Sequence, residues 1–216
     1  GLVEYTLEGA GVQAVGEVSA NTRLAQSFTC GDGGWRGEEI WLNVRKSGAP
    51  GDQLQVQLCA DSGGAPGTAL SAAALAGASL SADFRWTKWS LAAPVQLAAG
   101  AAYWVVVSRS GGLDASNAYR LRVNEGLGFS GGVLRLYNGS GWAARSPDAD
   151  LLFRFAGNAE TSAQIAAAAA PGAGGQFLAG VRLDAASGIF TNPYRAGDRT
   201  AWEEINAHLK AGQAGG

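Results

Sequence analysis

The sequence is short of the side chains that enzymes most often use as bases, nucleophiles and metal ligands. Its 216 residues include one histidine, two cysteines and no methionine. Nucleophilic catalysis needs a general base within hydrogen-bond reach, but the lone His208 lies beside Lys210 on a predicted helix, where we expect a solvated position. No Gly-x-Ser-x-Gly turn comes before a predicted helix. We therefore expect a protein that is not an enzyme.

Charge and long apolar runs are also scarce. Charged residues make up 16% of the chain, against about 25% in an average domain. The formal net charge of −2 provides no basic field for nucleic acid or for an anionic membrane. No apolar run approaches the roughly 18–20 residues of a membrane span. The 33 glycines suit an all-β domain with short, uncharged loops.

The carboxylates do not suggest a glycosidase, which needs two of them about 5–9.5 Å apart across a cleft. Glu38 and Glu39 are adjacent and should point to opposite sides of a strand. Asp148 and Asp150 should share a face where a strand begins, and a strand-end role is expected for them. With Asp61 they could hold a structural calcium ion, but no compact Asp-x-Asp-x-Asp loop is present. We expect no cofactor, with structural calcium as the alternative.

Two further features concern the chain as a whole. Cys30 and Cys59 each end a predicted strand. They could form a disulfide if their Cα atoms came within about 7 Å, or remain two buried free thiols. The absence of methionine even at position 1, and the final Gln-Ala-Gly-Gly, indicate a segment excised from a longer protein, or else a processed mature chain.

The strongest pattern is the stretch Phe84–Val107, in which apolar residues alternate in two runs joined by a turn at Gly100. Such alternation, rich in aromatic and β-branched residues, is typical of strands. The second run, Tyr103–Val107, is apolar on both faces and should lie near the middle of a sheet. Further strands are expected around residues 24–30, 40–45, 54–58, 119–123, 133–137 and 151–155, while 69–82 fits a helix or an edge strand.

Short strands separated by Gly/Pro turns predict a mainly β fold, a jelly-roll β-sandwich over residues 22–157. Residues 1–21 are expected to form a lead-in strand or a linker. Residues 158–216 predict a small, partial α/β segment of a second domain: a helix over Ser162–Ala170, a strand over Phe177–Leu183, and a helix beginning after Asp198 and ended by Gly212.

The seven tryptophans are the main functional signal, because sugar rings bind to aromatic faces supported by a few polar groups. Trp89, Tyr103 and Trp202 fit core positions, Trp104 fits either a core or an exposed position, and Trp41 should be partly exposed. The candidate ligand-binding residues are aromatic side chains near turns and strand starts, with polar companions beside them: Trp35, Trp86, Tyr137 and Trp142, with Arg85, Asn138 and Arg145.

Several segments together resemble a known type of module. They are LAQSF at 24–28, KSG at 46–48, ADSGGAPGTAL at 60–70, PVQLAAGAAYWVVV at 94–107, YNGSGW at 137–142 and DLLFR at 150–154. Their order resembles jelly-roll modules of bacterial surface and phage tail proteins, similar to choice-of-anchor and carbohydrate-binding-module-like sandwiches. The segment GIFTNPYRAGDRTAWEEI at 188–205 resembles part of the tail-tip or baseplate hub proteins of long-tailed phages and phage-derived particles.

This resemblance implies a virion protein at the tail tip, non-catalytic and commonly a homo-trimer. Its expected partners are a host envelope glycan or surface receptor and other tail or baseplate proteins, with no nucleic acid and no membrane span. Two alternatives stay open. The sandwich could be a purely structural spacer or docking domain in the tail, or a carbohydrate-binding module of a secreted bacterial protein.

Overall fold

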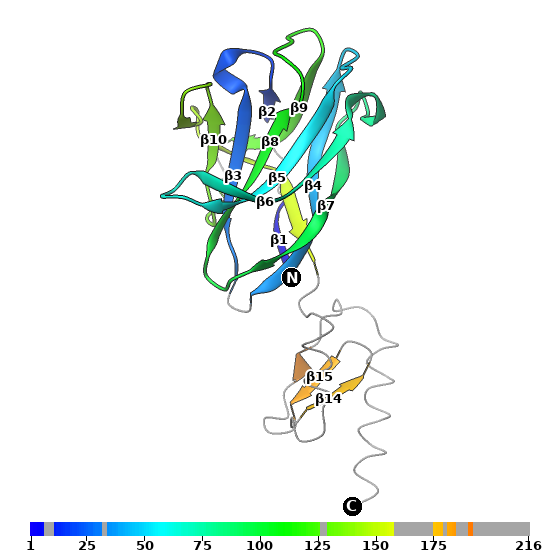
Figure 1. Cartoon of the computed structure of the whole chain (residues 1–216), viewed down its shortest axis with the longest axis vertical. Helices are drawn as coiled ribbons and strands as arrows, with labels where there is room; N and C mark the ends of the chain where they lie inside the picture. The colour runs from blue at the N-terminus through cyan, green and yellow to red at the C-terminus, as the bar shows by residue number, and fades with distance from the viewer. Residues whose placement is uncertain are drawn as a thin grey trace, which may run out of the picture. The chain divides into compact units, whose positions relative to one another are not determined.

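A computed structural model describes residues 1–6, 11–31, 34–125 and 129–157, together with three short strands further along the chain. The chain divides into two units, Gly1–Ala159 and Glu160–Gly216 (Figure 1). In the described residues of the first unit, one seven-stranded and one six-stranded antiparallel sheet form a β-sandwich. The mainly β fold expected from the sequence is therefore confirmed.

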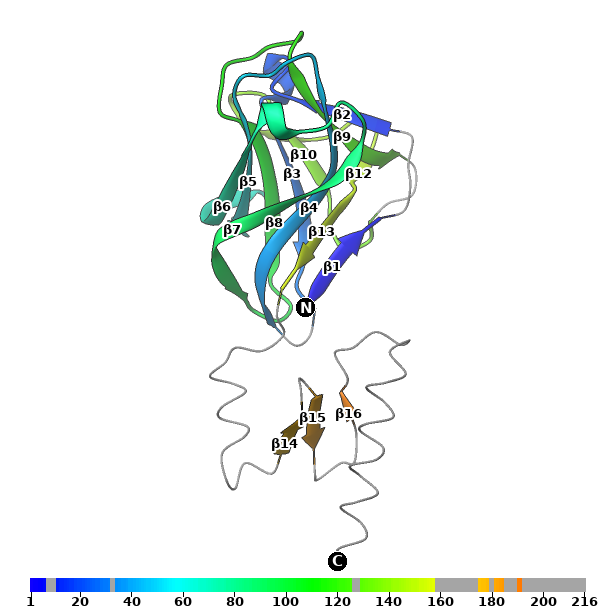
Figure 2. The ribbon, with the colours of Figure 1, turned by 90° about the vertical axis from the view of Figure 1, so that its right-hand side faces the viewer.

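The two sheets are here called sheet A and sheet B. Sheet A has the order β1 (Leu2–Tyr5), β13 (Phe153–Ala156), β4 (Trp35–Ser47), β9 (Ala118–Glu125) and β12 (Ala149–Leu151), with β2 (Gly11–Val15) paired to β9 and β7 (Arg85–Leu97) paired to β4. Sheet B has the order β11 (Trp142–Ala144), β10 (Leu134–Tyr137), β3 (Arg23–Thr29), β8 (Ala102–Arg109), β5 (Gln53–Asp61) and β6 (Pro66–Ala76). Figure 2 shows β1, β13 and β4 side by side.

The topology is that expected of a jelly roll rather than of a simple meander. The chain crosses between the sheets at most connections, for example from β3 to β4 to β5 and from β7 to β8 to β9. As a result, central neighbours are distant in sequence: β3 pairs with β8, and β4 pairs with β9. Residues 1–21 supply β1 and β2 to sheet A.

Alternation of apolar and polar side chains along the strands produces the core between the sheets. In β5, Leu54, Val56 and Leu58 are fully buried, while Gln55 and Gln57 between them are only half-buried. Successive side chains of a strand point to opposite faces, so the three aliphatic residues enter the core and the glutamines face outward. Burial of each large apolar side chain contributes about 1.5–3 kcal/mol.

The apolar run of β8 is buried on both of its faces, as predicted. Tyr103, Val105 and Val107 belong to the core between the sheets, whereas Trp104 and Val106 join a second cluster with Ala25 and Cys59 on the outer side of sheet B. β8 lies between β3 and β5, near the middle of the sheet. Trp104, for which the sequence left both positions open, is 2% exposed.

The ambiguous segment 69–82 contains an edge strand. Most of it belongs to β6, which pairs with β5, and β6 is followed by the 3-10 turn η2 (Gly77–Ser79). The other described helical turn is η1 (Ser19–Asn21). No helix in the described part of the chain is long and apolar enough to span a membrane.

The two cysteines are free and buried, which confirms the thiol alternative. Cys30 belongs to the core between the sheets, whereas Cys59 belongs to the cluster on the outer side of sheet B. The two side chains therefore lie on different faces of the sheet. Burial raises the pKa of Cys30, and it raises the pKa of Cys59 to about 11.

In the second unit the structure describes β14 (Gly175–Leu178), β15 (Val181–Asp184) and β16 (Phe190–Thr191), which form an antiparallel sheet. The prediction of one strand over 177–183 was wrong, because Leu178 pairs with Val181 as the last residue of β14 and the first of β15. The predicted helices over 162–170 and after Asp198 lie outside the described residues, as does Trp202.

Candidate ligand-binding face

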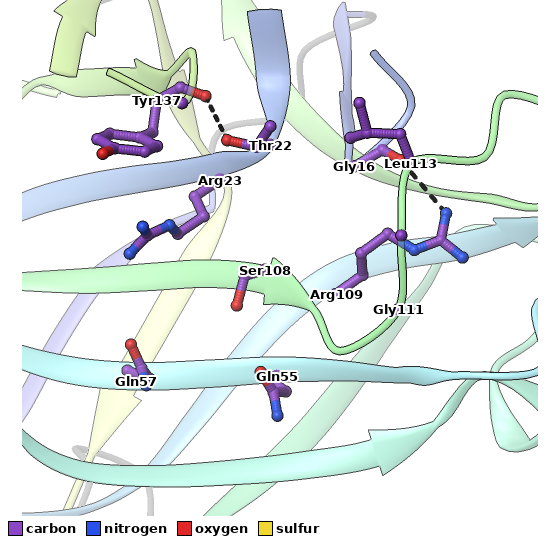
Figure 3. Close-up of a pocket in the computed structure, with 12 residues that line it drawn as sticks. Gly16, Thr22, Arg23, Gln55, Gln57, Ser108, Arg109, Gly111, Leu113 and Tyr137 are labelled. Carbon is purple, nitrogen blue, oxygen red and sulfur yellow. Dashed lines mark hydrogen bonds between the residues drawn. The ribbon is translucent and has the colours of Figure 1, made fainter. Parts of the chain in front are cut away.

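The outer side of sheet B contains a groove of about 570 Å³ (Figure 3). Its floor comes from β3, β5 and β8, and its walls come from the end of β10 and from the loop after β8. The lining is mostly polar and includes Arg23, Gln55, Gln57, Ser108 and Tyr137. The exposed Leu113, in the loop after β8, supplies an apolar side chain to one wall.

Strand register places five of the outward side chains in one row across the sheet. Gln55 is paired with Ser108, Ser108 with Arg23, Arg23 with Tyr137, and Tyr137 with Trp142. Neighbouring strands lie about 4.8 Å apart, so the row is roughly 20 Å long. A ligand lying across the strands could contact every member of the row.

The polar members of the groove floor have no hydrogen-bond or ion-pair partner among the described residues. The side chains of Arg23, Gln55, Gln57 and Ser108 make no hydrogen bond or ion pair with any described residue. In Figure 3 these four side chains come from three neighbouring strands of the groove floor. Polar side chains on neighbouring strands can stabilise a sheet by hydrogen-bonding to each other, and these four do not. This group is therefore available for hydrogen bonds to a ligand.

The hairpin of β10 and β11 brings two of the predicted aromatic residues together. The Tyr137 and Trp142 rings are 5.1 Å apart and inclined at 56°. Two hydrogen bonds fix the hairpin to the start of β3, because Thr22 donates from its backbone N–H and from its hydroxyl to the carbonyl oxygen of Tyr137, at 3.0 and 2.8 Å. The Arg23 guanidinium lies 4.4 Å from the Tyr137 ring centre. The hairpin therefore presents an aromatic pair with a cation stacked on it.

The opposite wall of the groove is held by a buried ion pair. Arg109 donates to both carboxylate oxygens of Asp52, from Nε at 2.7 Å and from Nη2 at 3.0 Å, and its Nη1 donates to the Gly16, Asp114 and Asn117 carbonyls. Burial acts to raise the pKa of Asp52, but hydrogen bonds from Arg109, Tyr119 and the Gly111 N–H outweigh it and lower that pKa. Arg109 therefore has a structural role and is already neutralised.

Trp35 is a correction to the predicted ligand-binding set. It is 6% exposed and its ring lies 5.0 Å from that of Phe155 in the core. Alternation from Ile40 would place Trp35 on the outside, but the pairing of β4 with β7 shifts between Gly37 and Glu39. This bulge reverses the facing of the residues before it. Gly37 accommodates the bulge, because a Cβ there would lie 2.0 Å from Phe155 Cζ.

Trp86 and Arg145 are not at the groove either. Trp86 is half-buried on the outer side of sheet A, where the Arg154 guanidinium lies 5.2 Å from its ring. Arg145 has a side chain that is 8% exposed, and its donors are occupied by Gln13, Glu125 and the Pro147 carbonyl. It therefore fixes β11 to sheet A instead of offering donors to a ligand.

Asn138 lies in the β10–β11 turn, and its side-chain oxygen shapes that turn. Asn138 Oδ1 accepts hydrogen bonds from the Ser140 N–H, the Ser140 hydroxyl and the Gly141 N–H. Arg85, at the start of β7 in sheet A, is exposed and does not line the groove. Of the seven predicted residues, the structure thus brings together Tyr137, Asn138 and Trp142. The sequence interpretation missed Arg23, Gln55, Gln57 and Ser108. Two outward glutamines on one strand were visible, but the row that they join depends on pairing between distant strands.

The candidate calcium ligands are not brought together. In the described residues, no group of three or more His, Cys, Asp or Glu side chains could hold a metal ion. Asp61 accepts from Trp104 Nε1 at 2.7 Å, and this bond and one from Gly64 lower its pKa. Asp150 is buried, accepts from Gln26 and the Phe129 N–H, and has a pKa raised by burial, while Asp148 is exposed.

Comparison with known proteins adds no relative. No protein-family model matches the chain, and no curated protein matches it either.

Proposed function

We propose that the sandwich is a non-catalytic saccharide-binding module whose ligand lies across the groove of sheet B. The observation that supports this most directly is the row Gln55–Ser108–Arg23–Tyr137–Trp142, in which polar side chains without hydrogen bonds to other described residues continue into an aromatic pair. Sugars present hydroxyl groups at their edges and C–H groups on their faces. A row of amide, hydroxyl and guanidinium groups beside aromatic rings matches both.

The groove suits an extended chain better than a compact small molecule. It lies open on the outer face of a sheet, and it is continuous with the hairpin that presents Trp142. Such open sites usually bind weakly, but copies linked in one particle raise the overall affinity without new contacts. The proposal also covers the setting of the module. We propose that it contacts host-surface glycans from the tail tip of a phage or phage-like particle, as a homo-trimer, where copies are linked in this way.

The proposal is tested by binding of the full chain to a glycan array and to insoluble polysaccharides. Trp142→Ala and Gln55→Ala should each weaken binding, by about tenfold for the loss of the aromatic contact. Trp142 packs against the outer cluster, so Gln55→Ala serves as the variant that removes no hydrogen bond between described residues. Trp41→Ala, on the outer side of sheet A, is the matched tryptophan control and should bind normally.

The proposal would be contradicted if the chain bound no saccharide, or if Trp41→Ala weakened binding as much as Trp142→Ala does. Firm binding to a neighbouring tail protein in place of a saccharide would support the structural docking alternative.

A further inference from the structure

We propose that the saccharide is anionic, and that Arg23 binds its carboxylate or sulfate group in the groove. This inference rests on the proposed function, because it assigns a chemical class to the ligand of the same site. Three features support it: the charge balance of the groove face, the geometry of Arg23, and the neutral hydrogen-bonding groups around it.

The charge balance of this face is positive. Arg23 and Arg135 project from β3 and β10, and Arg23 is paired with Tyr137, two residues beyond Arg135. Such diagonal neighbours lie about 7–8 Å apart. Neither arginine forms a salt bridge with a carboxylate in the described part of the chain, and Arg135 Nε is buried without a hydrogen-bond partner. Arg23 therefore lacks a counter-charge among the described residues, whereas Arg135 interacts electrostatically with the Asp61 carboxylate without forming an ion pair.

The nearby carboxylates are already engaged elsewhere. Asp52 is held in two hydrogen bonds by Arg109 and accepts others from Tyr119 and Gly111. Asp61 accepts from Trp104 and Gly64. Neither is therefore placed to neutralise Arg23, and an anionic ligand could supply the missing charge.

Arg23 is held in a geometry that suits a planar anion. Its guanidinium stacks on Tyr137 at 4.4 Å, and Thr22 and Trp142 fix Tyr137 in turn. Stacking occupies the flat face of the guanidinium but leaves its N–H edge free for two parallel hydrogen bonds to a carboxylate. The stacked cation also covers part of the Tyr137 ring that a neutral sugar would use. In Figure 3 the Arg23 side chain lies beside Tyr137 on the groove floor.

The remaining groups indicate a saccharide and not simply an inorganic anion. Gln55, Gln57 and Ser108 offer neutral donors and acceptors along the row, as hydroxyl groups require. These neutral groups continue the row from Arg23 toward β5, on the side away from Arg135, so a sugar chain with its acidic group at Arg23 would place its hydroxyl groups along them. Recognition of a densely charged polymer such as nucleic acid relies on many cationic contacts. The groove therefore fits a saccharide with one acidic group per residue or per repeat.

The experiment compares matched acidic and neutral polysaccharides using the full chain. The probes are polygalacturonate and its methyl ester, hyaluronan and its methyl ester, and dextran sulfate and dextran, together with an array of acidic and neutral glycans. We expect an acidic member to bind at least about tenfold more tightly than its neutral partner, with a preference that weakens as salt rises. Arg23→Gln should abolish that preference.

Arg85→Gln is the matched control. Arg85 is an exposed arginine of sheet A whose side chain has no hydrogen bond, ion pair or ring contact among the described residues, and its replacement changes the net charge equally. Arg85→Gln should keep the preference for the acidic probe. If Arg23→Gln and Arg85→Gln lost the preference for the acidic probe equally, the effect would be one of overall charge, and the inference would be overturned.

The other outcomes separate this inference from the proposed function. Binding of carboxylated probes alone, or of sulfated probes alone, supports the inference and identifies the anionic group. Equal binding of acidic and neutral partners, unaffected by Arg23→Gln, overturns the inference but leaves saccharide binding in place. Binding to none of the saccharides overturns both.

Discussion

The two outer faces of the sandwich use similar side chains but differ in how these are paired. On sheet A, register places Lys88, Trp41, Arg154 and Glu4 in one row across four strands. Lys88 pairs with Glu39 and Arg154 with Glu4, both at 3.0 Å, and the two cations lie near the Trp41 and Trp86 rings. On sheet B, the row through Arg23 contains no carboxylate.

This difference shows that composition alone does not identify a binding face. Both faces carry arginine and tryptophan, and the sequence favoured Trp86 as readily as Trp142. On sheet A the cations have their acidic partners on neighbouring strands, and that row is neutralised internally. On sheet B the row through Arg23 has no acidic partner on its neighbouring strands, and an acidic ligand could provide one. Each of the following predictions tests this comparison, beginning with the core that both faces share.

The largest expected effect is that of Val105→Asp, which places a charge on the core side of β8. Val105 is fully buried, and an unpaired buried charge costs more than the roughly 5–15 kcal/mol by which a domain is stable. The variant should be unfolded by circular dichroism. Ser108→Asp, three residues along on the groove side, should stay folded. If Val105→Asp kept the native circular dichroism spectrum, the placement of Val105 in the core between the sheets would be contradicted.

A smaller but still large loss of folding stability is expected from Asp52→Asn at the groove wall. Asp52 and Arg109 have side chains that are 15% and 6% exposed, and breaking such a pair typically costs about 3–5 kcal/mol at neutral pH. Urea unfolding of the variant and of the wild type measures the difference between their free energies of unfolding. Asp83→Asn, at an exposed aspartate, is the control and should change stability little.

The same pair predicts a pH dependence of definite sign. Because the folded state lowers the pKa of Asp52 below 3.8, the stability from its ionised form is complete above that value. It should be lost as the pH falls through the lowered pKa. The wild type and Asp52→Asn should therefore converge in stability at low pH, and a constant difference down to about pH 2 would contradict the assignment.

The smallest effect is expected on the face of sheet A. Lys88→Gln removes an ion pair whose side chains are 43% and 36% exposed, and such surface pairs contribute less than about 1 kcal/mol. Denaturant unfolding should show a change within that limit, and saccharide binding should be unaffected. A large loss of binding in Lys88→Gln would mean that the ligand lies on sheet A and would reverse the comparison of the two faces.

The alternation of the sequence was sufficient to predict the strands of the core, and it failed where pairing changes direction or register. Tyr103–Val107 and Leu54–Leu58 lie where the pattern indicated. Trp35 was misplaced because a bulge is a property of two paired strands. Arg145 was misassigned because its partners, Gln13 and Glu125, lie on strands distant in sequence.

The sequence by itself determined that this chain folds as a β-sandwich, because alternation of apolar and polar residues decides which face of each strand is buried. It also indicated Tyr137 and Trp142, since only a short turn separates them. Only the tertiary structure decided that Arg23, Gln55 and Ser108 lie beside them. These residues meet through pairing of β3, β5 and β8, and the order of strands in a sheet depends on the packing of the whole domain.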